Sequence, residues 1–107
     1  MKGYQITFFT QQDRRHGHTP LAEWLMLAAR ELGIRGATII AGSEGYGHHR
    51  RIHSAHFFEL ADQPQEVVMA LNEEEADQFF ALLEKEAVHC FYVKSPVEFG
   101  VLGEPDQ

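Results

Sequence analysis

The first third of the chain alternates apolar and polar residues and then changes to a helical period. Apolar residues occupy alternate positions from Tyr4 to Phe9, which predicts a β-strand. After a loop over residues 11–18, Thr19 predicts a helix N-cap and Pro20 the first helical position. Apolar residues then recur at helical spacing, at Leu21, Trp24, Leu25, Ala28 and Leu32. Gly33 predicts the end of this helix.

The middle of the chain predicts two extended arms around a glycine-rich loop, followed by another strand. Residues 37–41 are strand-like, and residues 54–60 form the second arm of the predicted hairpin. Residues 66–71 are apolar at nearly every position, which is typical of a strand that is covered on both faces. Asn72 then predicts a helix start, since Glu75 lies three residues further on and completes a capping box.

The last part predicts a second helix and one or two further strands. The buried stripe of that helix is predicted at Ala76, Phe79, Phe80, Leu83 and Ala87. Residues 88–93 predict a strand that Pro96 breaks, and residues 97–102 predict a short final strand. The order βαβ, hairpin, βαβ predicts an α+β, ferredoxin-like (split βαβ) fold, in which an antiparallel sheet has two helices on one face.

Two helices cover only one face of such a sheet, so the other face needs a different cover. We expect that face to include some of Phe9, Ile39 or Ile40, Val68, Ala70, Phe91 and Val93. This surface is too apolar to stay in water. The pattern therefore predicts self-association.

Length and charge narrow the class of protein. The 107 residues predict one domain, 1–107, and the formal net charge of −7 argues against binding to nucleic acid or to an anionic membrane surface. Cys90 is the single cysteine, which excludes an intrachain disulfide, and the first residues lack the continuous apolar run of a signal peptide or membrane span. We therefore expect a cytoplasmic protein without direct membrane insertion.

Positive charge is nevertheless concentrated in two short segments. Four of the nine basic residues and five of the seven histidines lie within residues 14–18 and 48–53. Arginine and histidine donate hydrogen bonds to anionic oxygens, and glycines such as Gly45 and Gly47 let a backbone approach a ligand closely. The candidate donors are Arg14, Arg15, His48 and Arg50. This arrangement predicts a site for a small anion.

Two other kinds of site are weighed against the anion site. His48, His49 and His53 are candidate metal ligands, although their spacing matches no recognised zinc signature. The sequence contains no paired carboxylates, no nucleophile with an activating base and no P-loop, so we do not expect an enzyme.

Several runs of residues resemble a known superfamily. They are Asp13 to Gly17, Pro20-Leu21, Gly36 to Ile40, Gly45-Tyr46-Gly47 and Gln63-Pro64. Together they resemble the PII signalling proteins, and more closely the PII-like family catalogued as domain of unknown function 190. The resemblance spans nearly the whole chain. It implies a homotrimer with small-molecule sites in the clefts between subunits, where PII-type proteins hold adenine nucleotides.

The resemblance also implies roles for individual residues. Thr38 matches a threonine near the adenine, and Gly45 and Gly47 match the glycines at the root of a flexible loop. His48 and Arg50 occupy the start of the phosphate-facing region. The second phosphate loop of PII proteins is replaced here by residues 86–90. Arginines 14, 15 and 50 could partly replace its cation.

The sequence therefore predicts a non-catalytic, PII-like regulatory protein that binds a small anionic ligand, most plausibly an adenine nucleotide, and requires no cofactor. The hairpin over residues 42–63 is expected to pass the signal to a regulated protein that the sequence does not identify. Residues 42–53 are expected to be poorly ordered until ligand binds. The alternative is a divalent-metal-binding protein akin to the CutA family, which shares the trimeric fold.

Overall fold

A computed structural model describes residues 1–41, 44–46, 52–54 and 63–103 of the chain. Its helices are α1 (Leu21–Glu31) and α2 (Glu73–Lys85). Its long strands are β1 (Lys2–Gln11), β4 (Gly36–Ala41), β7 (Pro64–Asn72) and β8 (Phe91–Glu98). Shorter strands are β2 (Arg15–His16), β3 (Thr19–Pro20), β5 (Glu44–Tyr46) and β6 (Ile52–Ser54).

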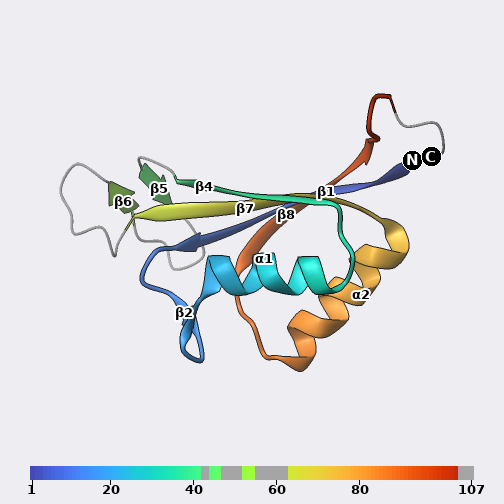
Figure 1. Ribbon diagram of the computed structural model, residues 1–107. Coiled ribbons are helices and arrows are strands. Elements are labelled where there is room, and N and C mark those ends of the chain that lie inside the picture. Colours follow the sequence, from blue (N-terminus) through green and yellow to red (C-terminus); the bar gives the residue numbers. More distant parts are fainter. Residues whose placement is uncertain (42–43, 47–51, 55–62, 104–107) are drawn as a thin grey trace.

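The four long strands form one antiparallel sheet in the order β4-β7-β1-β8. Both helices lie on the same side of this sheet, whereas the β5–β6 hairpin extends from one end of it and the N-terminus lies at the other end (Figure 1). This arrangement is the α+β, ferredoxin-like plan, so the predicted fold class is confirmed. The sheet has a covered face, which packs on α1 and α2, and an open face.

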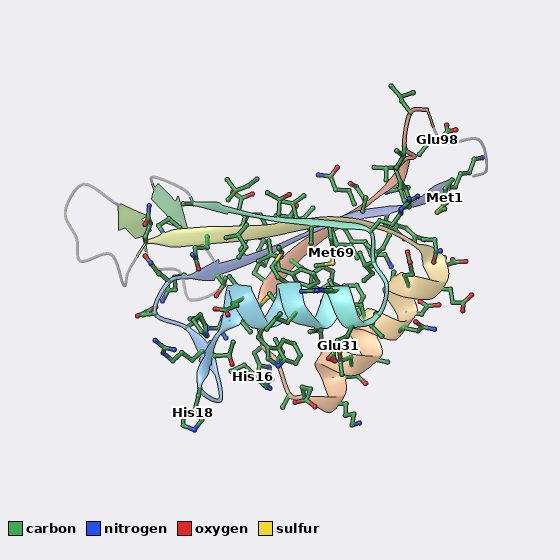
Figure 2. The ribbon with its side chains drawn as sticks, in the orientation of Figure 1. Met1, His16, His18, Glu31, Met69 and Glu98 are labelled. Atoms are coloured by element: carbon green, nitrogen blue, oxygen red, sulfur yellow. The ribbon has the colours of Figure 1, made fainter. Side chains whose placement is uncertain are left out.

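The hydrophobic core lies between the covered face and the helices. Alternate residues of β1 and β7 supply the sheet side, namely Ile6, Phe8, Val67, Met69 and Leu71. Met69 points from the sheet toward the helix layer in Figure 2. The helices contribute Leu21, Ala22, Leu25, Ala28, Ala29, Ala76, Phe79 and Leu83. Trp24 and Phe80, which were both predicted in the core, are only partly buried against it.

The open face carries the other residues of the same strands. Strand pairing places Thr38, Val68, Thr7 and Val93 in one row across the sheet, and Phe9 opposite Phe91. Because side chains alternate between faces, the open face includes Phe9, Ile40, Val68, Ala70, Phe91 and Val93. Phe91 and Val93 are 47% and 49% exposed in the single chain. The predicted apolar surface is therefore present.

The start of α1 differs from the prediction. The N-cap is Pro20, and no side chain caps the helix. Thr19 instead pairs with His16 in the small β2–β3 ladder. The backbone N–H of Leu21 donates to the carbonyl oxygen of Arg14 at 2.8 Å. A distant backbone carbonyl therefore takes the place that the threonine hydroxyl was expected to fill.

The start of α2 agrees with the prediction. The Asn72 side chain accepts a hydrogen bond from the Glu75 N–H at 2.8 Å, and the Glu75 carboxylate accepts one from the Asn72 N–H at 2.9 Å. This is the predicted capping box.

Both helices end with the same pair of backbone hydrogen bonds but with different residues after the cap. After α1, the N–H groups of Gly33 and Ile34 donate to Arg30 and Ala29, and Gly33 has φ 81°. After α2, the N–H groups of Ala87 and Val88 donate to Glu84 and Leu83 in the same pattern. Ala87 has φ 55°, a conformation that favours glycine. Ala87 is exposed and lies beyond the helix, so its predicted place in the buried stripe is wrong.

The last strand is also longer than predicted. β8 runs from Phe91 to Glu98 without interruption, and Pro96 pairs with Tyr4 of β1. The predicted strand over 88–93, its break at Pro96 and the final strand over 97–102 are therefore wrong. Proline is tolerated here because β8 is an edge strand of the sheet, so one of its sides has no ladder to supply.

Candidate ligand-binding site

Among the predicted ligand-binding residues, Thr38 is the one that the sheet itself positions. It lies in β4, pairs with Val68 of β7, and its side chain is on the open face. Thr38 is exposed in the single chain. A ligand that reaches it therefore approaches from the side of the sheet opposite the helices.

Arg14 and Arg15 lie in the loop over residues 12–18, which we call the Arg14 loop. Arg14 Nη2 donates to the carbonyl oxygen of His89 at 2.6 Å. Arg15 Nη1 donates to the carbonyl oxygen of His18 at 3.2 Å. A guanidinium has five N–H donors, so each arginine retains donors for an anion while it makes this contact. His18 lies at the tip of the β2–β3 hairpin and points away from the fold (Figure 2).

The Arg14 loop and the glycine-rich hairpin meet at the same end of the sheet. The Gln12 N–H donates to the carbonyl oxygen of Gln63 at 2.9 Å, which joins the loop to the residue before β7. The β5–β6 hairpin extends beyond this end (Figure 1). The Arg14 loop is therefore bonded to the residue that ends the predicted 42–63 hairpin.

The predicted hairpin arms do not pair with each other: residues 36–41 pair with β7, and residues 55–60 lie outside the described residues. β5 and β6 pair antiparallel, and Gly45 lies opposite His53 in that ladder. Gly47, His48, His49 and Arg50 lie outside the described residues. The same holds for most of the segment that was expected to be ordered by ligand. The structure therefore brings Gly45 beside His53 and shows Arg14 and Arg15 in one loop, but it does not bring Thr38 and Arg14 to one face.

A metal centre was the alternative kind of site. Within residues 1–41, 44–46, 52–54 and 63–103, no group of three or more His, Cys, Asp or Glu side chains is placed to hold a metal ion.

A groove of about 480 Å³ opens at the other end of the sheet, beside the start of α2. Its walls come from β1, β8 and the first residue of α2, and they are formed by Lys2, Gly3, Tyr4, Glu73, Pro96, Val97 and Glu98. None of the predicted ligand-binding residues lines this groove. The predicted site is thus separate from this hollow of the single chain.

Sequence reasoning missed a cluster that ties the Arg14 loop to the end of α2. His16 Nε2 lies 3.1 Å from Glu86 Oε1, and the imidazole lies 4.5 Å from the Trp24 ring, centroid to centroid. His16 and Glu86 are 70 residues apart, so no spacing rule could pair them. Only the fold brings them together.

Cys90 lies near Arg14 and is partly buried. Burial raises the pKa of the Cys90 thiol above its usual range, while the nearby Arg14 charge and a backbone hydrogen bond with Phe9 act in the opposite direction. The result favours the neutral thiol, so Cys90 is a poor nucleophile at neutral pH. Cys90 is partly buried and lies immediately before β8.

Comparisons with known proteins place this fold and its open sheet among the ferredoxin-like proteins of the PII type. The chain belongs to the DUF190 family, described as uncharacterized ACR, whose model matches residues 3–99. A curated relative, a UPF0166 protein of Aquifex aeolicus (strain VF5), is 31% identical over 70 residues, which is 65% of this chain and 67% of that protein. The predicted family is therefore confirmed.

Two solved structures share the fold at low sequence identity. CPII of Thiomonas intermedia K12, a nitrogen regulatory PII-like protein bound to ADP, AMP and bicarbonate, is 17% identical with a TM-score of 0.68. That match covers 94% of this chain and 91% of CPII. A protein of Thermus thermophilus assigned to the PII-like signaling proteins is 15% identical with a TM-score of 0.61, covering 91% and 86% of the two chains.

Neither helix in the described part of the chain has the length and apolar character needed to cross a bilayer.

Proposed function

We propose that this chain is a non-catalytic, PII-like regulatory protein that binds an adenine nucleotide in clefts between the subunits of a homotrimer. The observation that carries the proposal is the match over nearly the whole chain to CPII, which was solved with ADP, AMP and bicarbonate. Family membership over residues 3–99 supports the proposal over nearly the same length of the chain.

The open face supports the subunit arrangement. It exposes apolar side chains of four adjacent strands, including Phe91 and Val93 at 47% and 49% exposure. Patches of this kind on soluble proteins mark interaction surfaces. Thr38 lies on this face, so a ligand that contacts it in a trimer would sit where the open faces of neighbouring subunits meet.

The distribution of charge supports an anionic ligand. The Gln12–Gln63 hydrogen bond of 2.9 Å joins the Arg14 loop to the C-terminal end of the predicted 42–63 hairpin. Positive groups on the two segments can therefore act on one phosphate group, although the chain as a whole is acidic. We propose that the phosphate is held by Arg14, Arg15, His48 and Arg50. The hairpin over residues 42–63 would then report the bound state to a partner protein.

The test is calorimetric titration of metal-stripped protein with AMP, ADP, ATP and cyclic AMP at low and moderate salt. Arg50→Ala should weaken nucleotide binding by about 1.5–3 kcal/mol, the range for a hydrogen bond to a charged group. Arg30→Ala is the matched control, because Arg30 is an exposed arginine in the last turn of α1. Binding to the unaltered protein should decrease as salt rises.

The competing function is binding of a divalent metal through His48, His49 and His53. The same titration with zinc and with copper separates the two functions. If all four nucleotides fail at millimolar concentration and a metal binds tightly, the nucleotide proposal is wrong. Equal loss of affinity in Arg50→Ala and Arg30→Ala would reject the assigned site while leaving nucleotide binding in place.

A further inference from the structure

Two side-chain contacts fasten the Arg14 loop to the connection between α2 and β8, which comprises residues 86–90. One is the hydrogen bond from Arg14 to the His89 carbonyl oxygen, at 2.6 Å. The other is the contact between His16 Nε2 and Glu86 Oε1, at 3.1 Å. Both contacts join residues that are 70 or more positions apart in the chain.

His16 is partly buried between two packed elements. Its side chain is 27% exposed, and that of Glu86 is 38% exposed. The Trp24 ring of α1 lies 4.5 Å from the imidazole, centroid to centroid, and Glu86 is the C-cap residue of α2. The imidazole therefore contacts an aromatic ring of one helix and a carboxylate at the end of the other.

Other charged groups lie on the elements that pack around His16. In its own loop, Arg14 is bonded to the His89 carbonyl and Arg15 to the His18 carbonyl. On the helices, Glu23 precedes Trp24 in α1 and Lys85 ends α2. The other ionisable residues of the loop and the connection are Asp13, His18, His89 and Cys90. Among the described residues, the ion pair recorded for His16 is with Glu86.

We propose that His16 and Glu86 form a pH-sensitive clasp that fastens the Arg14 loop to residues 86–90. Imidazole is the side chain whose ionisation lies between pH 5 and 8. Protonation converts the neutral hydrogen bond into an ion pair, so the clasp tightens as pH falls from 8 to 6. This inference goes beyond nucleotide binding, because it does not require any ligand.

The expected size follows from the partial exposure of the pair. Measured interactions of solvent-exposed ion pairs correspond to a change of about 1.4- to 5-fold in an equilibrium constant. Cys90 supplies a reporter, because it is the single cysteine and it ends the connection that the loop contacts. Opening of the clasp should expose its thiol.

The experiment measures the rate of Cys90 labelling by a methanethiosulfonate reagent at pH 6, 7 and 8, without nucleotide. The proteins are the unaltered chain, His16→Gln, Glu86→Gln and the double variant, with His18→Gln as the matched histidine control. Glutamine can keep a neutral hydrogen bond to Glu86 but carries no charge. Rates are compared as ratios at the same pH, which removes the common dependence on thiolate. Urea denaturation of the unaltered chain, the two single variants and the double variant gives a double-mutant cycle.

The proposal requires that His16→Gln and Glu86→Gln label about 1.4- to 5-fold faster than the unaltered chain at pH 6 and at nearly equal rates at pH 8. His18→Gln should match the unaltered chain throughout. The proposal is wrong if the double-mutant cycle shows no coupling energy between His16 and Glu86 at pH 6. It is also wrong if that coupling energy is the same at pH 6 and pH 8. If the coupling energy changes with pH but the rate of Cys90 labelling does not, His16 and Glu86 form only a local ion pair that does not hold the loop. That outcome also rejects the proposal.

Discussion

The two faces of the sheet differ most clearly at two adjacent residues of β1. Phe8 is 1% exposed, and its ring packs 5.6 Å from that of Phe79, centroid to centroid. Phe9 points the other way, and its ring lies 5.5 Å from that of Phe91, which is itself 47% exposed. The strand β1 thus contributes one side chain to the closed core and the next to an apolar surface that needs a partner. Residue chemistry alone does not distinguish them, since both are phenylalanine; only the strand parity does.

The largest expected effect is the loss of Phe8. Phe8→Ala removes a ring from the closed core and should lower the free energy of unfolding by about 3–5 kcal/mol. Phe9→Ala is the matched variant, and it should cost clearly less within one chain because the open face already meets solvent. Urea denaturation at protein concentrations below those at which the chains associate measures both, so that loss of a subunit contact does not add to the effect of Phe9→Ala. If both variants lower the free energy of unfolding equally, the two faces of the sheet contribute equally to the stability of the chain. That result would contradict the difference between Phe8 and Phe9.

The second test places a charge on the open face. Val93→Asp should weaken each subunit contact by about 1–3 kcal/mol, because assembly would bury an unpartnered polar group. Light scattering should then report three chains for the unaltered protein and fewer for the variant. Leu27→Asp is the control, since Leu27 on α1 is 47% exposed and Val93 is 49% exposed.

A trimer that survives Val93→Asp would show that the open face is not the subunit contact. A fall in mass caused equally by Leu27→Asp would instead point to a general effect of added charge. The two variants together therefore test which face the assembly uses.

The smallest effect concerns the helix layer that closes the other face. Ala87 has φ 55° at a position where α1 has Gly33. Ala87→Gly should raise the free energy of unfolding by about 0.5–1 kcal/mol, since an L-residue with a side chain is disfavoured in that conformation. Gly33→Ala is the reciprocal variant and should lower it by a similar amount. Thermal unfolding detects both changes, and opposite signs are the expected result.

The elements that could be predicted were those set by local spacing. The capping box at Asn72 and Glu75 lies within four residues, and the open face follows from alternation along strands. Pro96 was misjudged because its effect depends on whether its strand has neighbours on both sides, which is a property of the sheet. Ala87 was misjudged because helical spacing continues past the point at which the chain turns.

The candidate site also has some features that local sequence predicts and others that only the fold determines. The two cationic segments could be recognised from composition, because arginine, histidine and glycine gather in short runs. The contact from Arg14 to His89 spans 75 positions and uses a backbone carbonyl, which every residue possesses. No residue type signals such a partner. The pairing of His16 with Glu86 was hidden for the same reason.

Pro96 has a further consequence for the free edge of β8. β8 is an edge strand, and its exposed residues Phe91 to Val93 are apolar, which is a combination that invites another chain to add as a strand. Proline has no N–H, so residue 96 offers no backbone donor to a strand added along this edge. Cross-β growth pairs each backbone group with the next chain. One imino acid near the end of β8 therefore disfavours the addition of a further strand there.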